Sequence, residues 1–385
     1  MSSISQLIDR LCPDGVVYKP LGDLLDYEQP GKYIVKSDDY NDKYDTPVLT
    51  AGQSLLLGYT NETNGIYKAS KESPTIIFDD FTTGFHWINY PFKVKSSAMK
   101  MLQPKKNVDF RYIYYAMRCI NYSPQEHTRQ WISKYSTFEV AVPPIEVQHE
   151  IVNILDTFTD AIDNLQRELE DRKKQLEYLK NKLLCDDVLL CPKKTLGEMG
   201  TFIRGNGLQK NDFTDSGYPC IHYGQIHTSY NIATSRTIAF TSEEYAKRLR
   251  KADRGDLLIA TTSEDVEACC KAIAWLGKDK VAVSGDMYIY HHTQDPMYMM
   301  YLFQTNMFFR QKQKAAIGAK VIRVSGESMA KFEFPMPSIS YQKKVADQLN
   351  NFAELIYNAI PAEISLRQKQ YEYYRDKLLT FKRKH

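Results

Sequence analysis

The chain has 385 residues, of which 43% are hydrophobic and 25% are charged, and its formal net charge is +3. These values exclude a mainly disordered chain, and the length exceeds the roughly 100–200 residues of an average domain. So small a net charge gives no bulk electrostatic sign of a nucleic-acid partner, which has to be inferred from local groups.

The sequence carries no sign of a membrane or export segment. No stretch approaches the roughly 18 consecutive apolar residues of a transmembrane helix. Residues Met1–Ser5 lack the basic and apolar regions that open a signal peptide. The seven cysteines show neither a Cys-x-x-Cys pair nor the spacing of a disulfide framework. We therefore expect a cytoplasmic protein.

The two halves of the chain resemble each other, which is typical of an internal duplication. Near the start of each half, Lys19–Asp23 corresponds to Lys194–Glu198. Further along, a proline-rich segment occurs twice, as Phe138–Gln148 and Phe332–Gln342. The duplication predicts four segments: a globular domain over residues 1–144, a helical spacer over 145–185, a second globular domain over 186–340 and a second helical spacer over 341–385.

Both globular domains have the composition of mixed α and β structure. Short runs bounded by turn residues, such as Thr75–Phe78, Leu257–Ala260 and Met287–Tyr290, are typical of strands. A mostly polar helix is predicted over Ser242–Arg254. The expected fold class is therefore α+β, with two mixed domains and two long helices.

Each helical spacer repeats apolar residues at alternating intervals of four and three, the period of a coiled coil. An arginine interrupts each seam at a matching position, and Pro361 predicts a break or kink in the second helix. One alternative is that each helix packs on its own domain. The length and repetition of the seams favour an antiparallel pair, with the domains at opposite ends. The seam residues are Ile151, Leu155, Phe158, Ile162, Leu165, Leu169, Arg172, Leu176, Leu179 and Leu183, and then Val345, Leu349, Phe352, Ile356, Ala359, Ile364, Arg367, Tyr371, Tyr374, Leu378 and Phe381.

A search for catalytic motifs finds none. Neither a phosphate-binding G-x-x-x-x-G-K-[ST] loop nor a G-x-G-x-x-G loop occurs, and no His/Cys spacing is typical of zinc. Asp295–Tyr298 lacks one proline of the D-P-P-Y signature of amino-methyltransferases. The acidic and basic pair Asp171 and Lys173 lies on a predicted helix and not in a cleft. We therefore predict no catalytic residue, metal site or cofactor in this chain.

Loops that mix small polar, amide and basic side chains favour a binding function. Such side chains contact base edges and phosphates of DNA. The basic run Lys247–Lys251 fits either a solvated helix face or phosphate contact. Lys134 and the pair Lys320 and Arg323 are expected in equivalent DNA-facing loops. The candidate DNA contacts are Thr82, Thr83, His86, Gln130, Lys134, Thr262, Lys320 and Arg323.

With these motifs in place, the chain resembles the specificity (S) subunit of type I restriction-modification systems over essentially its whole length. The resemblance rests on Leu11–Val16 with Leu21–Asp23, on Gly255–Thr261, on Pro143–Gln148 and on the terminal Arg367–Leu379. The first helix departs from the fuller motif, because Leu176 and Leu179 stand where the second helix has Tyr371 and Tyr374.

The resemblance implies that each globular domain is a target recognition domain for one half of a bipartite, asymmetric double-stranded DNA sequence. The helices would set the distance between the domains and dock two methyltransferase (M) subunits. Restriction (R) subunits would join them, and S-adenosylmethionine, ATP and Mg would bind to the partner subunits. The alternative is a coiled-coil protein-interaction scaffold without DNA specificity. The candidate partner contacts are Tyr178, Tyr373, Tyr374 and Arg375.

Overall fold

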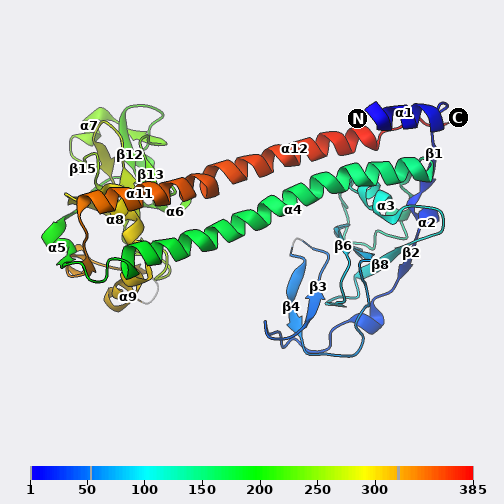
Figure 1. Cartoon of the computed structure of the whole chain (residues 1–385), viewed down its shortest axis with the longest axis horizontal. Coiled ribbons are helices and arrows are strands. Elements are labelled where there is room, and N and C mark those ends of the chain that lie inside the picture. Colours follow the sequence, from blue (N-terminus) through cyan, green and yellow to red (C-terminus); the bar gives the residue numbers. More distant parts are fainter. Residues whose placement is uncertain (1, 53, 319–320, 385) are drawn as a thin grey trace. The chain divides into compact units, whose positions relative to one another are not determined.

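The structure is a computed structural model that describes residues 2–52, 54–318 and 321–384. It divides into two compact units, which are described separately (Figure 1). Unit 1 consists of residues 1–164 and 365–385, and unit 2 of residues 165–364. Among the described residues, no helix combines the length and the apolar character needed to span a membrane.

Unit 1 combines small sheets with short helices. Its strand orders are β2-β8-β5-β6, β4-β3-β7 and β1-β9. The strands are β1 (Val17–Pro20), β2 (Leu25–Glu28), β3 (Thr46–Leu49), β4 (Leu56–Thr60), β5 (Thr75–Asp79), β6 (Phe85–Ile88), β7 (Lys93–Val94), β8 (Met99–Pro104) and β9 (Glu139–Val142). The helices before the long one are α1 (Ser2–Leu11), α2 (Leu21–Leu24), η1 (Gly31–Tyr33), α3 (Phe110–Met117) and η2 (Tyr135–Thr137).

The core of unit 1 is built on strand β5 and helix α3. Residues Ile76–Phe78 of β5 have no exposed surface, and neither have Tyr112 and Ile113 of α3. A continuous apolar run of this length is typical of a strand that is buried on both faces. The strand predicted over Thr75–Phe78 is confirmed, because β5 begins at Thr75 and ends one residue later than expected.

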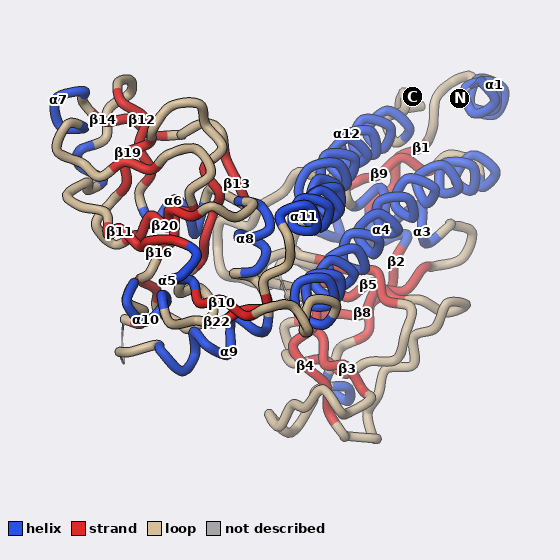
Figure 2. The backbone as a smooth tube through the Cα atoms, turned by 60° about the vertical axis from the view of Figure 1, so that its left-hand side comes forward, coloured by secondary structure: helices blue, strands red, loops and turns tan. Residues whose placement is uncertain are grey.

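Unit 2 holds larger sheets, ordered β11-β20-β16-β18-β13 and β14-β12-β19-β15, together with the pairs β10-β22 and β17-β21. Figure 2 shows β11, β20 and β16 side by side. The strands are β10 (Lys193–Thr195), β11 (Gly200–Arg204), β12 (Tyr218–Ile221), β13 (Ala233–Thr234), β14 (Ala239–Thr241), β15 (Lys251–Ala252), β16 (Leu257–Ala260), β17 (Thr262–Ser263), β18 (Lys271–Trp275), β19 (Val281–Val283), β20 (Met287–His292), β21 (Ile322–Arg323) and β22 (Glu333–Pro335). The short helices are η3 (Lys182–Asp186), α5 (Leu196–Met199), η4 (Lys210–Asp212), α6 (Tyr223–Thr228), α7 (Glu243–Ala246), α8 (Pro296–Leu302), α9 (Asn306–Ala315) and α10 (Gly326–Ala330).

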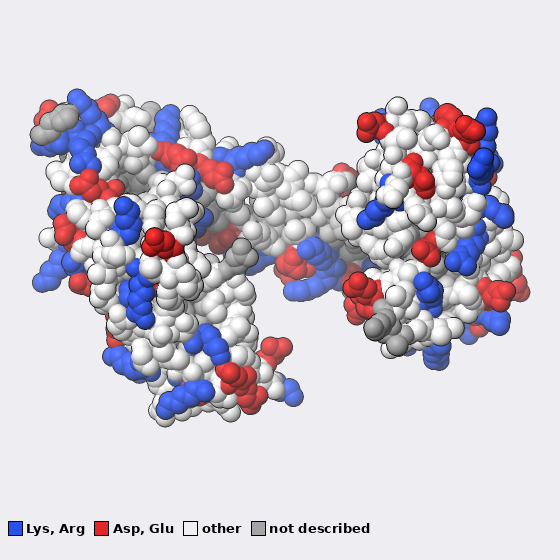
Figure 3. Space-filling model, turned by 180° about the vertical axis from the view of Figure 1, so that it is seen from behind, with Lys and Arg blue, Asp and Glu red and all other residues white. Residues whose placement is uncertain are grey.

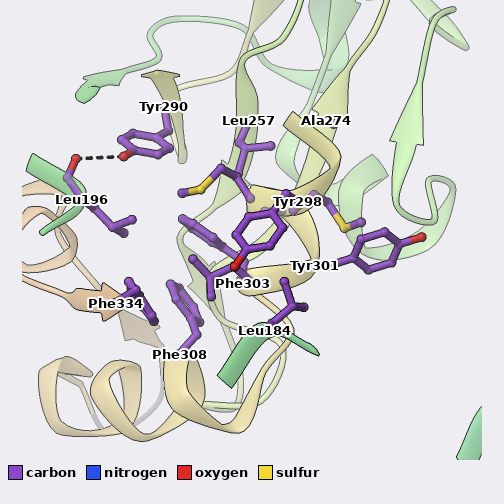
Figure 4. Close-up of a cluster of buried hydrophobic side chains, with 14 of the residues drawn as sticks. Leu184, Leu196, Leu257, Ala274, Tyr290, Tyr298, Tyr301, Phe303, Phe308 and Phe334 are labelled. Carbon is purple, nitrogen blue, oxygen red and sulfur yellow. Dashed lines mark hydrogen bonds between the residues drawn. The ribbon is translucent and has the colours of Figure 1, made fainter. Parts of the chain in front are cut away.

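The main core of unit 2 lies between the sheet, the helices α8 and α9, and the long helices (Figure 4). Tyr290 of β20 is fully buried, and its hydroxyl donates to the carbonyl of Leu196 over 2.8 Å. Phe303 and Phe308 stack with ring centroids 4.3 Å apart. The strands predicted over Leu257–Ala260 and Met287–Tyr290 are confirmed as β16 and β20.

The predicted polar helix over Ser242–Arg254 is wrong beyond its first turn. Helix α7 ends at Ala246, and Lys251 and Ala252 form strand β15, which pairs with β19. Leu249 and Ala252 are buried in unit 2. Tertiary pairing of this segment with a sheet therefore outweighs its local helical preference.

The long helices pair with each other in each unit. Helix α4 runs from Ile145 to Asn181, and the second long helix consists of α11 (Ile339–Glu354), the π-helical turn η5 (Leu355–Ala359) and α12 (Ile360–Leu378). In unit 1, Phe158 of α4 stacks on Tyr374 of α12 with ring centroids 5.2 Å apart. In unit 2, Leu176 of α4 belongs to the same buried cluster as α11 and η5. The early part of α4 thus meets the late part of the second helix, which confirms the antiparallel pairing.

Of the break or kink predicted at Pro361, the break does not occur, but a π-helical turn interrupts the α-helix just before this residue. The helix passes from α11 through η5 into α12, and the flanking residues Leu355 and Ile360 keep right-handed helical dihedral angles. A π-helical turn is wider than an α-helical one and shifts the hydrogen-bond register by one residue. It therefore absorbs the one-residue slip of the seam that the sequence places before Ile364, without ending the helix.

A buried glutamine ties the start of helix α4 to the domain of unit 1. The Gln148 side chain is 1% exposed, and its Oε1 accepts a hydrogen bond of 2.9 Å from the backbone N–H of Asp109. Its Nε2 donates to the carbonyl of Pro143 over 2.8 Å. Asp109 is the N-cap of α3, because its Oδ1 accepts from two backbone N–H groups of that helix. One amide side chain therefore joins the proline-rich turn, α4 and α3.

Unit 2 repeats this joint. Gln342 is fully buried, its Oε1 accepts from the backbone N–H of Asp295 over 3.0 Å, and its Nε2 donates to the carbonyl of Pro337 over 2.9 Å. Asp295 is the N-cap of α8. The same side chains thus hold the same elements in both units, as the duplication predicts.

Both ends of the chain lie in unit 1, where Figure 1 marks them beside α1. The backbone N–H of Val16 donates to the carbonyl of Lys382, and the N–H of Lys384 donates to the carbonyl of Val16, each over 2.9 Å. The Tyr18 hydroxyl adds a bond of 2.9 Å to the carbonyl of Phe381. The last residues of the chain therefore extend the edge from which β1 begins.

We predict that replacing Gln148 by alanine destabilises unit 1. The substitution leaves the N–H of Asp109 and the carbonyl of Pro143 buried without partners, so the free energy of unfolding should fall by about 2–4 kcal/mol. Urea unfolding followed by fluorescence measures the change. The matched control is Gln166→Ala, on the exposed face of the same helix, which should change stability by less than about 0.5 kcal/mol. Equal effects of the two variants would contradict the role assigned to Gln148.

Candidate nucleic-acid interface

On the face that Figure 3 shows, charge alone does not mark a binding surface. Basic and acidic side chains are interspersed over both units on this face. A continuous basic surface is absent from this view among the residues that are described. The candidate interface therefore has to be located from individual loops.

In unit 1, Thr82 and Thr83 form the tight turn between β5 and β6. Asp79 Oδ1 accepts from the backbone N–H of Thr82 over 2.9 Å, and the backbone N–H of Thr83 donates to the carbonyl of Asp79 over the same distance. Thr83 has a positive φ of 59°, a conformation that costs energy for a β-branched residue. Thr82 is exposed, whereas Thr83 is 8% exposed. Two hydrogen bonds to Asp79 thus close the turn, and Thr82 is the residue that it presents to solvent.

His86 follows on β6 and contacts a second loop. Its Nε2 lies 3.1 Å from the carbonyl oxygen of Gly52. The imidazole is half-buried. The structure thus brings His86 close to the turn that carries Thr82 and uses one of its ring nitrogens for a bond within the protein.

The structure separates the roles of the two candidates in the next loop. Gln130 is 4% exposed; its Nε2 donates to the carbonyl of Thr128 over 2.8 Å, and its Oε1 accepts from the Tyr122 hydroxyl over 2.8 Å. Both ends of this amide are therefore used inside the loop. Lys134 is exposed, with its Nζ 5.8 Å from the ring centroid of Phe138. Of the two side chains, only that of Lys134 presents its polar group to solvent.

In unit 2, two candidates lie directly opposite each other. Thr262 of β17 pairs with Arg323 of β21 in an antiparallel ladder. Ile317 also pairs with Arg323, because the N–H of Ile317 donates to the carbonyl of Arg323 over 3.0 Å and the reverse bond is 2.9 Å. Arg323 is exposed, and Ile317 is 72% exposed. The candidate Lys320 lies outside the described residues.

Lys134 and Arg323 hold related places in the two units. Lys134 comes directly before η2, which leads into β9. Arg323 comes two residues before Ser325, the N-cap of α10, which leads into β22. Strand β9 pairs with β1 in unit 1, and β22 pairs with β10 in unit 2. Each basic residue therefore precedes the short helix that leads into the second strand of the corresponding pair.

Of the four candidate partner contacts on the long helices, two are mostly exposed and two are less so, although the Tyr373 ring also packs edge-on against Tyr374 with centroids 5.2 Å apart. Tyr178 is 64% exposed and Tyr373 is 61% exposed. Tyr374 stacks on Phe158, as described above, and Arg375 forms an ion pair of 2.6 Å with Asp376. Tyr178 and Tyr373 therefore present aromatic surface, whereas the other two stabilise unit 1.

The segment that resembles a methyltransferase signature has a structural role. Asp295 caps α8, and Pro296 occupies the first turn of that helix, where a missing N–H costs nothing. Tyr298 is fully buried. Among the described residues, no cluster of His, Cys, Asp and Glu is arranged to hold a metal ion.

Comparison with known proteins decides the family. The family described as "Type I restriction modification DNA specificity domain" matches the chain twice, over residues 13–173 and 192–366. The chain belongs to the type I restriction-modification DNA specificity family. A relative in Escherichia coli, the type I restriction enzyme EcoR124I/EcoR124II specificity subunit, is 36% identical over 410 aligned residues, which cover 99% of this chain and 97% of that protein.

Solved structures of the family share the fold. The S subunit of a type I restriction-modification system from M. genitalium superposes with a TM-score of 0.56 at 14% identity, over 94% of this chain and 96% of that one. A second, described as concerning complex assembly and conformational transition of the type I R-M system, gives a TM-score of 0.55 at 11% identity, over 96% and 98% of the two chains. Two mixed domains with long paired helices are therefore the architecture of this specificity family.

Sequence reasoning missed the side chains that hold each specificity domain on its helix. Asp109 with Gln148, and Asp295 with Gln342, lie too far apart in the sequence for their contact to be read from spacing. One signal was available, because the pattern Asp-x-x-Tyr-x-x-Tyr occurs at both Asp109 and Asp295. A pattern that recurs in both halves of a duplicated chain indicates a shared structural role.

Burial of His292 makes the stability of unit 2 sensitive to pH. Burial lowers the pKa of His292 to about 4. Its Nδ1 accepts from the backbone N–H of Gln294 over 3.2 Å, and its buried Nε2 has no partner among the described residues. The unfolded chain takes up a proton at this side chain below about pH 6.5, whereas the folded chain does so only near pH 4.

We predict that unit 2 loses stability as the pH falls from 7 to 4. Protonation favours the unfolded chain in that window, and the loss through His292 should reach about 3 kcal/mol. In His292→Asn, the side-chain oxygen can accept the bond from Gln294 but does not titrate. Urea unfolding at several pH values should show a shallower pH dependence for this variant, by that amount. Parallel curves for variant and wild type would exclude this source of pH sensitivity.

Proposed function

We propose that the chain is the DNA-reading subunit of a type I restriction-modification complex and that each domain reads one half of a bipartite, asymmetric target in double-stranded DNA. The observation that carries this proposal is the double match to the specificity domain, because each match covers one globular domain together with its helix. The two domains share a repeated backbone arrangement but carry different surface residues, which suits the reading of two different half-sites. The domains proposed are residues 1–144 and 186–340, with spacers 145–185 and 341–385.

The exposed candidates are proposed as the DNA contacts. Thr82 and Lys134 serve in unit 1, and Thr262 and Arg323 in unit 2, with Thr83, His86 and Gln130 shaping the loops that present them. Lys320, next to this set in sequence, joins it as a proposed phosphate contact. An arginine beside a threonine on a two-residue ladder suits a base edge and an adjacent phosphate.

We assign assembly to the long helices. Tyr178 and Tyr373 are exposed aromatic residues at matching places in the repeat, and tyrosine is enriched at protein interfaces. In the proposed complex, two M subunits dock on these helices, where Tyr374 and Arg375 support the contact surface, and R subunits complete the assembly. S-adenosylmethionine, ATP and Mg are assigned to the partner subunits, and this chain carries no catalytic step.

The direct test is to co-express the chain with a type I M subunit and to map methylated adenines in the host DNA. Methylation confined to one bipartite motif, with each half lost when the corresponding domain is deleted, would support the proposal. Methylation that persists without this chain, or an intact complex that methylates nothing, would favour the protein-interaction scaffold instead.

We predict that Arg323→Ala weakens specific DNA binding by about 1–3 kcal/mol and relaxes one position of the half-site read by unit 2. The measurement is a binding titration of the assembled complex on duplexes that carry the mapped motif and its single-base variants. Arg254→Ala is the matched control, because Arg254 is exposed and precedes β16, whereas Thr262 follows its opposite end. Unchanged affinity and preference would remove Arg323 from the interface.

We predict that a four-residue helical insertion after Asn164 changes the spacing between the half-sites. Four residues add about 6 Å to a helix, which corresponds to between one and two base pairs at about 3.4 Å each. Methylation mapping of the variant measures the spacing. The same insertion after Asp42, in an exposed loop of unit 1, should leave it unchanged. An identical spacing in both variants would mean that α4 does not set the distance.

A further inference from the structure

Unit 2 contains a polar cleft that no linear pattern in the sequence predicts. It has a volume of about 320 Å³ and opens where β11, β12 and β19 end and β20 is about to begin. Its lining includes Arg204, His222, Ser284 and Asp286. These residues come from separate segments of the chain, which only the fold brings together.

The cleft is preformed by its backbone. The N–H of Gly205 donates to the carbonyl of Met287 over 2.9 Å, and a Cβ at Gly205 would lie 2.1 Å from the carbonyl oxygen of Ser284. A side chain at this glycine is therefore excluded. Asn206 then fixes the next loop, because its Nδ2 donates to the carbonyl of Arg248 over 2.8 Å and its Oδ1 accepts from the N–H of Arg250 over 2.6 Å.

The cleft offers hydrogen-bond donors. Ser284 Oγ accepts from the backbone N–H of Tyr223, so its own hydrogen remains available. His222 Nδ1 accepts from the N–H of Gly224 over 3.2 Å, which leaves the proton of the neutral ring on Nε2. Burial lowers the pKa of His222, and the charge of Lys210 acts in the same direction. The neutral donor form therefore predominates at pH 7.

Exposed cations lie on the cleft and on the segments that adjoin it. Arg204, Lys210, Arg248 and Arg250 are exposed, and no ion pair joins any of them to the described acidic residues. Arg204 Nε donates to the carbonyl of Gly285 over 3.2 Å, which anchors its guanidinium beside the cleft. In the lining itself, Arg204 is the one Lys or Arg and Asp286 the one acidic residue; Lys210 follows the lining residue Gln209, and Arg248 and Arg250 lie on the segment bonded to Asn206.

The cleft adjoins the ladder that carries the proposed base-reading residues. The backbone N–H of Thr261 donates to the carbonyl of Asp286 over 3.2 Å. Thr262, the next residue, pairs with Arg323. A concave, donor-rich surface next to this ladder suits a DNA strand whose bases face Thr262 and Arg323 and whose backbone crosses the cleft.

We propose that this cleft is a phosphate clamp for the DNA backbone, in which Arg204, Ser284 and His222 contact a phosphate and Arg248 and Arg250 contact its neighbours. The proposal rests on the DNA-reading function and adds a site that determines affinity but not sequence. Asp286 then opposes binding, because its carboxylate repels a phosphate. If Asp286 instead accepted a hydrogen bond from a base, its loss would weaken binding and alter the motif.

The test uses the full chain assembled with M subunits and a duplex that carries the mapped motif. In the double variant Arg248→Gln with Arg250→Gln, affinity should fall by at least about tenfold at 0.1 M salt, and the slope of log K against log salt should become less steep by about 1.8. The methylated motif should stay unchanged. The matched control is Arg254→Gln with Lys278→Gln, two exposed cations at the far ends of β16 and β18, which should leave both affinity and slope unaltered.

The single variant Asp286→Asn keeps the shape of the side chain but removes its negative charge. The expected change in DNA affinity is therefore opposite to that of the basic variants. Binding should tighten by roughly three- to fivefold, with the same motif, whereas Asp279→Asn, an exposed control, should have no effect. Thermal unfolding of each variant shows that the fold is retained. Weaker binding of Asp286→Asn, or an altered motif, would overturn the clamp.

Two further measurements distinguish the clamp from a free-anion site and from a failure of DNA reading. Inorganic phosphate at constant ionic strength should not displace the DNA; displacement would assign the cleft to a free anion and overturn the proposal. If the wild-type complex methylates a bipartite motif and the basic variants bind like their controls, only the clamp fails. If the wild-type complex shows no sequence preference, the DNA-reading function fails and the clamp falls with it.

Discussion

The two-domain architecture depends on one buried amide in each unit. A glutamine on the first turn of each long helix satisfies a backbone N–H at the cap of the domain helix and a carbonyl of the proline-rich turn. Because an unpaired buried polar group costs more than a formed bond gains, such a joint tolerates few alternative orientations. Each domain is thus fixed on its helix by hydrogen bonds whose geometry is more specific than apolar packing.

Around this joint the two units have diverged in charge but not in geometry. The Tyr115 hydroxyl of α3 bonds the Asp156 carboxylate on α4, and the Tyr301 hydroxyl of α8 bonds Asn350 on α11 over 3.0 Å. In unit 1 the carboxylate also accepts from Arg111 over 2.8 Å. Unit 2 uses a neutral amide at the corresponding place and has no need of an arginine there. The two copies of a duplicated domain can therefore keep the same tyrosine contact while one uses a charged partner and the other a neutral one.

Sequence reasoning reached the parts of the fold that depend on local periodicity. Most of both helix seams and the strands β5, β16 and β20 were predictable, because apolar spacing reflects burial directly. Two predicted seam positions of the second helix are wrong, because Ala359 is exposed and Phe381 lies beyond the end of α12. Sequence reasoning failed after Ala246, where pairing with a sheet overrides the local helical preference. Near Pro361 it predicted a break or kink, and the structure has a π-helical turn that keeps the chain helical. The candidate site was only partly accessible. A polar loop residue such as Gln130 looks exposed in the sequence, yet the loop buries it to satisfy its own backbone.

The cleft of unit 2 was inaccessible for a different reason. Its donors come from the ends of several strands, and only the fold brings Arg204 and Ser284 together. The basic run at Lys247–Lys251 was visible in the sequence, but its position beside the cleft depends on the two bonds made by Asn206. Sequence patterns predict helices and strands well. They predict a binding site only where its residues lie within one helix, strand or loop.

The meeting of Val16 with Lys382 and Lys384 has a consequence for synthesis of the chain. Unit 2 is one continuous stretch, so all of it has left the ribosome before unit 1 receives its last segment. The N-terminal domain begins first and is completed last. Removal of residues 382–384 would therefore damage unit 1, whose first residues lie far away in sequence, and spare unit 2, which lies nearer in sequence.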